Sequence, residues 1–219
     1  MISSGTVRVT SAQVVRNLTL SGGTLDSTET LTVLGTMTWS GGTLRGPGIT
    51  KVASGAELDV AEGNQDRYLG GGHLLHNEGT VNWNGGSLES VKDGTATIQN
   101  DGTFHLRSPE LLNNGYGTGT RRFVNAGVLH HKTLSYRDTV WFSWPFENRG
   151  LVHVESGVLS LGAGGTHAGA LVTMSRARIE FRGSHRFVRG ASLEGNGQFV
   201  VSLAEWEISD NLRVTGTLV

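Results

Sequence analysis

The stretch HNEGTVNW at residues 76–83 joins an Asn, a variable residue and a Gly to a run in which apolar side chains alternate with others. The same pattern returns as QNDGTFHL from residue 99, VNAGVLHH from 124 and ENRGLVHV from 147. Its glycines are 23, 25 and 23 residues apart, at Gly79, Gly102, Gly127 and Gly150. A repeat of roughly this length, made of short strands and glycine turns, is typical of a solenoid.

Further copies extend the pattern toward the N-terminus. The stretch GTMTWSGGTL (35–44) matches GTVNWNGGSL (79–88), and SGAELDV (54–60) supplies the copy between them, with Gly55. A propeller blade needs about 40 residues, and a sandwich does not repeat its sequence in this way. We therefore expect one all-β domain over residues 1–219, a right-handed parallel β-helix of roughly 9–10 coils of 19–25 residues. We expect an irregular aromatic and basic region at about 107–146.

The alternation after each glycine predicts which side chains form the core. The second and fourth residues after the glycine should point inward and stack as columns, coil upon coil. These residues are Val81, Trp83, Phe104, Leu106, Leu129, His131, Val152 and Val154. His131 is the polar exception, and we expect it to be partly buried and satisfied by hydrogen bonds.

Four asparagines share one phase of the repeat and should therefore stack on one another. They are Asn77, Asn100, Asn125 and Asn148. A short side-chain amide can bond to a neighbouring turn, and stacked amides can form a ladder. The residues that follow them have no chemistry in common, so we interpret the four as a structural ladder placed where each strand begins.

Histidines occupy the third position after the glycine in three consecutive repeats. They are His105, His130 and His153, with Asn82 before them and Asp59 extending the line if its copy is shifted by one residue. Histidine is a common metal ligand, but a metal site needs three or four convergent ligands, and a straight stack on a flat sheet does not converge. We expect solvated or weakly stacked histidines, with adventitious metal affinity as the alternative.

The stretch LSYRDTVWFSWPF (134–146) interrupts the regular pattern with aromatic residues. Trp141 and Trp144 differ by an odd offset, so a straight strand would place one in the core and the other outside. Exposed rings beside polar groups mark binding surfaces, which makes Tyr136, Arg137, Trp141 and Trp144 the candidate ligand contacts. The alternative is that the rings fill a wider section of the core.

Composition excludes several classes of function. The formal charge is −1, from 18 basic and 19 acidic residues without a run of one sign, which argues against nucleic acid as a partner. There is no Cys, so the chain has neither a disulfide framework nor a thiolate site. No apolar run is long enough for a transmembrane helix, so we expect no membrane insertion, and the first residues do not resemble a signal peptide. The sequence indicates no cofactor.

Catalysis has little support in the sequence. Glycoside hydrolysis needs a pair of carboxylates, and the chain has no Asp-Asp pair and no nucleophile or metalloprotease motif. Asp59, Glu62, Asp66 and Arg67 form the only local acid and base cluster, which we interpret as a solvated turn. A polysaccharide-degrading enzyme remains the minor alternative.

Taken together, LTLSGGTL (18–25), GTMTWSGGTL, NEGTVNWNGGSL and ESGVLSLGAGG (155–165) resemble the β-helical repeats of large bacterial surface and secreted proteins. These include autotransporter passengers and filamentous-haemagglutinin-like adhesins. The resemblance covers nearly the whole chain and is weakest at 107–146. It implies a segment of a longer extracellular or cell-surface protein that acts as a structural or adhesive module, and it supplies no catalytic residues.

The resemblance also bears on partners. Surface glycans, or proteins of a host or neighbouring cell, are the expected partners, and carbohydrate binding is the alternative to a purely structural role. Neither end of the sequence shows a polar cap, which predicts end-to-end self-association or a cap that the pattern does not reveal.

Overall fold

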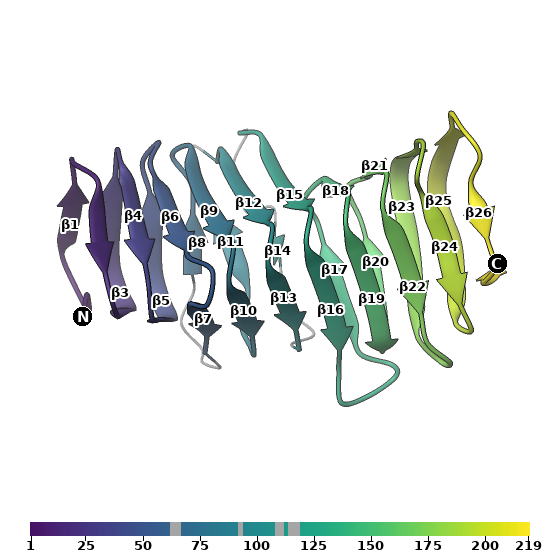
Figure 1. Cartoon of the computed structure of the whole chain (residues 1–219), viewed down its shortest axis with the longest axis horizontal. Helices are drawn as coiled ribbons and strands as arrows, with labels where there is room; N and C mark the ends of the chain where they lie inside the picture. The colour runs from purple at the N-terminus through teal and green to yellow at the C-terminus, as the bar shows by residue number, and fades with distance from the viewer. Residues whose placement is uncertain (62–66, 92–93, 108–111, 114–118) are drawn as a thin grey trace.

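A computed structural model of the chain describes residues 1–61, 67–91, 94–107, 112–113 and 119–219. Within these residues the regular secondary structure is entirely β, in 27 strands. The strands wind as coils stacked along one axis, from the N-terminus at one end to the C-terminus at the other (Figure 1). There are about nine turns, so the expected parallel β-helix is confirmed. The described residues contain no helix long and apolar enough to cross a membrane.

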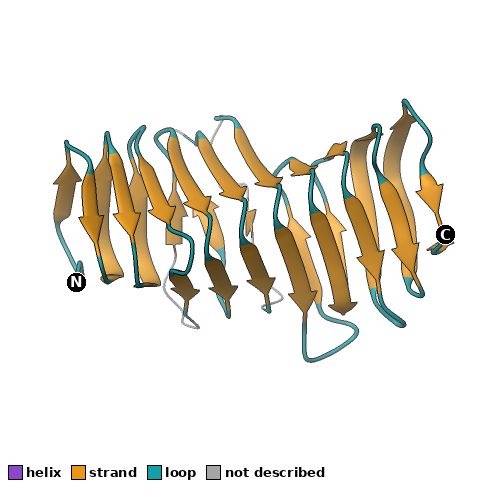
Figure 2. Ribbon diagram, in the orientation of Figure 1, coloured by secondary structure: helices purple, strands orange, loops and turns teal. Residues whose placement is uncertain are grey.

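Each coil passes through three faces, and the strands of each face pair in parallel with those one coil earlier and later (Figure 2). Face 1 consists of β1 (Thr6–Val9), the ends of β3 (Leu18–Ser27) and β5 (Thr36–Arg45), β8 (Arg67–Leu69), β11 (Leu88–Ser90), β14 (Leu112–Asn113), β17 (Thr139–Phe142), β20 (Val158–Leu161), the starts of β23 (Arg178–Phe187) and β25 (Gln198–Ile208), and β27 (Thr217–Leu218).

Face 2 follows face 1 along the chain. It consists of β2 (Gln13–Val15), β4 (Thr30–Val33), β6 (Ile49–Val52), β9 (His73–Asn77), β12 (Ala96–Asn100), β15 (Arg121–Asn125), β18 (Phe146–Asn148), β21 (Gly165–His167) and the ends of β23 and β25.

Face 3 closes each coil. It consists of the starts of β3 and β5, then β7 (Glu57–Val60), β10 (Thr80–Trp83), β13 (Thr103–Leu106), β16 (Val128–Lys132), β19 (Leu151–Ser156), β22 (Ala170–Thr173), β24 (Ser192–Gly195) and β26 (Arg213–Val214).

The register confirms the predicted alternation. Val81 pairs with Phe104, which pairs with Leu129, and Val152 follows in the same column. All eight side chains predicted to point inward are fully buried. His131 is therefore more deeply buried than we expected, with Nδ1–H donating to the Leu106 carbonyl oxygen at 3.2 Å. Among the described residues its Nε2 has no partner, and burial lowers the pKa of this histidine to about 4.

The asparagine ladder is present. Nδ2 of Asn77 donates to Oδ1 of Asn100 at 2.7 Å, and Asn100 donates to Asn125 at 2.7 Å. Asn125 in turn donates to Asn148 at 2.9 Å, and each Nδ2 also bonds to a main-chain carbonyl oxygen of the next coil. The position differs from the expectation, because each asparagine is the last residue of a face 2 strand and the face 3 strand begins beyond the bend. The four side chains are fully buried.

The motif glycines are needed for close packing between coils. None of the four adopts a positive φ. A Cβ on Gly127 would instead lie 2.1 Å from the carbonyl oxygen of Gly102, and one on Gly150 would lie 2.1 Å from that of Gly127. In the coil before Gly79, the equivalent residue is Ala56 rather than Gly55, because Glu57 pairs with Thr80. That one-residue shift puts Asp59 opposite Asn82, as predicted.

Candidate binding groove

The groove lies on the side of the solenoid, in its C-terminal half, next to the loop of residues 133–138 between β16 and β17. Figure 1 shows this loop projecting beyond the neighbouring turns. The groove has a volume of about 560 Å³. Its lining comes from the loop, from face 1 and from the corners that lead into face 1: Tyr136, Arg137, Val158, Arg176, Ala177, Arg178, Asn196, Gly197, Gln198 and Thr217.

The loop is held by its own hydrogen bonds and by the next coil. The Ser135 amide donates to Oδ2 of Asp138 at 3.2 Å, and Oγ1 of Thr133 donates to the Ser135 carbonyl oxygen at 2.9 Å. The Val158 amide donates to the Asp138 carbonyl oxygen at 2.8 Å, which fixes the loop to β20. The loop therefore presents Tyr136, half exposed, with the guanidinium of Arg137 lying 5.4 Å from its ring centroid.

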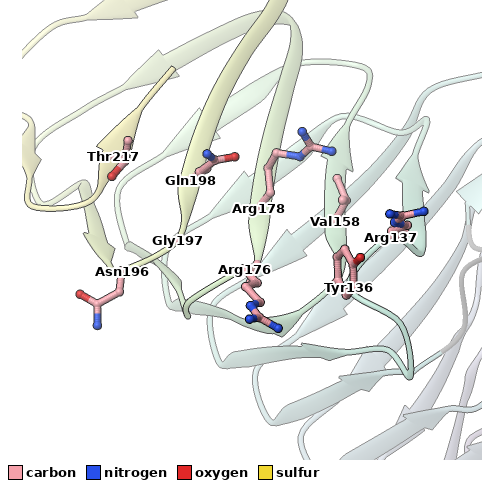
Figure 3. Close-up of a pocket in the computed structure, with 10 residues that line it drawn as sticks. Tyr136, Arg137, Val158, Arg176, Arg178, Asn196, Gly197, Gln198 and Thr217 are labelled. Atoms are coloured by element: carbon pink, nitrogen blue, oxygen red, sulfur yellow. The ribbon is translucent and has the colours of Figure 1, made fainter.

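The floor of the groove is an outward-facing column of face 1. Val158, Arg178, Gln198 and Thr217 follow one another in register on β20, β23, β25 and β27. Figure 3 shows them on successive strands, with Arg137 beyond Val158 and Tyr136 below it in this view. Val158 is only 3% exposed although its column faces outward, and the polar side chains beside it remain open to solvent.

Arg176 enters the groove from a four-residue turn, Met174–Ala177, in which the Ala177 amide donates to the Met174 carbonyl oxygen at 2.9 Å. Its φ of 68° lies in the left-handed region, which costs a non-glycine residue about 1–2 kcal/mol. Three other turns with this hydrogen bond, at residues 53–56, 70–73 and 188–191, place a glycine with positive φ at the same point, Gly55, Gly72 and Gly190. Arg176 thus occupies a position whose backbone conformation glycine would adopt with less strain.

The electrostatics of the groove are one-sided. Arg137, Arg176 and Arg178 contribute three guanidinium groups, and none of the three takes part in an ion pair within the described part of the chain. The lining residues include no carboxylate, and the remaining polar groups are the amides of Asn196 and Gln198 and the hydroxyl of Thr217. Guanidinium groups pair well with carboxylate and with the oxygens of other anions, so the groove suits an anionic or strongly polar ligand.

The four predicted ligand contacts divide into three groups. Tyr136 and Arg137 line the groove. Trp144 is fully buried and belongs to the core, which corrects the prediction that it contacts a ligand. Trp141 is 47% exposed on face 1 but outside the groove, and the Arg182 guanidinium lies 5.2 Å from its ring centroid. The prediction that one tryptophan is buried and the other exposed is confirmed.

The predicted histidine column also forms. The rings of His105 and His130 meet edge to face at 5.6 Å, and those of His130 and His153 stack at 5.2 Å. Nε2 of His130 lies 3.0 Å from Oε2 of Glu155. Burial, and after it the nearby charge of His130, lower the pKa of His153. Burial, and after it the charge of Arg107, lower the pKa of His105. No group of three or more metal-ligating side chains gathers within the described ranges.

The predicted acid and base cluster is only partly described, because Glu62 and Asp66 lie outside the described residues. Arg67 is fully buried, which corrects its assignment to a solvated turn. Its Nε donates to the Trp39 carbonyl oxygen at 3.0 Å and Nη2 to that of Ala61. Asp59 instead accepts a hydrogen bond from Nδ2 of Asn82 at 3.0 Å, on face 3.

Sequence reasoning missed Arg176, Arg178, Asn196, Gln198 and Thr217. A usable signal was present in SRARIEF (175–181), where two arginines alternate with apolar residues in the pattern of a strand. Counting coils onward from Asn148 would have placed these arginines two coils after the 133–138 loop.

Comparison with protein-family models, with curated proteins and with solved structures finds no match to this chain. The fold and the groove therefore carry the functional argument.

Proposed function

We propose that this β-solenoid is a structural and adhesive module of an extracellular or cell-surface protein, and that it contacts glycans through the groove beside the 133–138 loop. The observation that carries the proposal is the groove itself, with an exposed tyrosine and arginine on one wall and amide and hydroxyl groups along the floor. Side chains of these kinds bond to sugar hydroxyls, and aromatic rings pack against the apolar faces of sugar rings.

The setting favours binding by groups that are held in place in advance. Each strand that supplies the floor is paired in parallel with its neighbours, so the positions of the polar groups are fixed before a ligand arrives. The absence of a carboxylate among the lining residues favours binding over hydrolysis, because glycosidases work with two carboxyl groups.

A glycan array probed with the folded chain tests the proposal. We expect binding that Tyr136→Ala and Arg137→Ala weaken, and that Arg189→Ala leaves unchanged. Arg189 is an exposed arginine in the 188–191 turn and does not line the groove, so it serves as the matched control. Binding that survives both groove substitutions, or a chain that binds protein partners and no glycan, would remove the proposal. Release of product from a polysaccharide would replace it with catalysis.

A further inference from the structure

We infer that the groove selects an acidic saccharide, a segment of polymer carrying carboxylate or sulfate groups, and that Arg176 and Arg178 are its specificity-determining residues. The inference rests on the proposed function, because it names the ligand class of the same groove. Three guanidinium groups without an acidic partner supply the charge, and the amide and hydroxyl groups beside them supply contacts to sugar hydroxyls.

The first step of the argument is the placement of Arg176. Its turn has the same length and hydrogen bond as the turns that carry Gly55 and Gly190. Glycine at this point adopts a positive φ without strain, whereas arginine does not. The side chain of Arg176 is exposed and makes no ion pair in the described part of the structure, so packing and pairing do not account for it. Non-glycine residues held in this conformation cluster at functional sites.

The second step is the spacing of the charges along the solenoid axis. Arg137 lies two residues before Thr139, and Arg176 lies two residues before Arg178. Thr139 pairs with Val158 in the next coil, and Val158 pairs with Arg178 in the coil after that. The two arginines are thus two coils apart, roughly 10 Å at about 4.8 Å per strand. Arg178 projects from the strand that follows Arg176. The positive groups therefore extend along the groove, which suits a polymer with an anionic group on successive units better than one compact ion.

The third step separates a saccharide from a nucleic acid, which is also a polyanion. Nucleic-acid binding depends on a broad basic footprint, because its affinity comes from many phosphate contacts. Here the net charge of the chain is −1, and the groove is lined by three arginines rather than by a broad basic surface. The amide of Gln198 and the hydroxyl of Thr217 continue the floor beyond the arginines, with the amide of Asn196 at the adjoining corner, and these groups can bond to the hydroxyls of a saccharide.

The experiment compares four probes of similar length by calorimetric titration: a neutral glucan oligomer, an oligouronate, a sulfated oligosaccharide and single-stranded DNA. We expect one or both acidic saccharides to bind and to lose affinity as salt is added. Arg178→Ala should weaken binding about tenfold or more, since a hydrogen bond between charged groups supplies this much. The carboxylated and sulfated arms then tell which anion the groove prefers.

Arg176→Gly separates binding from folding. It should weaken binding about tenfold while leaving the urea midpoint unchanged or higher, because glycine relieves the left-handed backbone. Arg189→Ala, which removes the same charge outside the groove, should change neither.

Three results would overturn the inference. If the neutral oligomer binds as well as the acidic ones and Tyr136→Ala abolishes this binding, the groove still contacts glycans but does not select for charge. If DNA binds as tightly as the acidic saccharides, the assignment of a saccharide is wrong. If no saccharide binds, the proposed function fails together with the inference.

Discussion

Replacing Asn100 by Ala tests the structural reading of the repeat that opens the sequence. The side chain is fully buried and makes three hydrogen bonds. Its Nδ2 donates to Oδ1 of Asn125 at 2.7 Å and to the Val128 carbonyl oxygen at 3.1 Å, and its Oδ1 accepts from Asn77 at 2.7 Å. At about 1 kcal/mol for each bond, with a further penalty for the buried groups left without a partner, the substitution should cost about 3–5 kcal/mol.

The assay is urea unfolding of the wild type and variants, followed by far-ultraviolet circular dichroism and tryptophan fluorescence, with the midpoint and slope compared. Gln99→Ala is the matched control, because it removes an amide from the adjacent position, where Nε2 of Gln99 bonds to Asp101 at an exposed site. We expect the control to change stability by less than about 0.5 kcal/mol. Asn148→Ala, at the end of the ladder, loses two hydrogen bonds and should fall between the two.

The ladder also predicts non-additivity. A buried amide that loses its partner is costly, whereas removing both partners of a hydrogen bond is much less so. Val52 already occupies the equivalent position one coil before Asn77. Changing all four asparagines to Val should therefore cost less than the sum of the four single changes. The reasoning is refuted if Asn100→Ala is no more destabilising than Gln99→Ala, or if the fourfold variant equals or exceeds the sum.

Three further predictions follow from the core. Burial lowers the pKa of His131 to about 4 and that of His167 to about 3, below the ordinary value of 6.5 that they regain on unfolding, so the unfolded chain takes up protons first as the pH falls. The free energy of unfolding is therefore unaffected by these two histidines above pH 6.5 and falls as the pH drops toward the lower values. The loss should reach about 3 kcal/mol for His131 alone. A urea midpoint that stays constant between pH 7 and 4 would contradict this prediction. Gly127→Ala should destabilise the chain by about 1–3 kcal/mol in urea, because the new Cβ would meet a carbonyl oxygen at 2.1 Å, and a neutral result would show that the coils can separate. Trp144→Ala should cost about 3–5 kcal/mol and Trp141→Ala less than about 1 kcal/mol in the same assay, since the first ring is buried and the second half exposed; equal effects would be inconsistent with their orientation.

The repeat made the fold and much of the register predictable. Asn77 and its three counterparts mark the same phase of consecutive coils, and parallel pairing then aligns every position between them. Arg67 was misjudged because its burial depends on the carbonyl oxygens of Trp39 and Ala61, which no local pattern reveals. Trp144 was left ambiguous because alternation gives the relative orientation of two residues but not which of them faces the core.

The groove was harder to predict because it combines three segments that are distant in sequence. Tyr136 belongs to an insertion between two faces, Arg178 to a strand two coils later, and Thr217 to a strand two coils after that. Each follows local rules of its own, and only the coil count brings them to one side of the molecule. The sequence indicated that residues 134–146 carry added chemistry, but the surface completing it lies outside that segment.

A solenoid provides an internal reference for its own residues, because every position has counterparts in the neighbouring coils. His131 departs from an apolar column, but its ring is fully buried in that column and bonds to the Leu106 carbonyl oxygen through Nδ1. Arg176 departs from the glycine of otherwise equivalent turns and gains neither burial nor an ion pair within the described residues, while its backbone is strained. A departure that lowers stability without improving packing needs a reason outside the fold, and the adjacent groove, with two further arginines, supplies one.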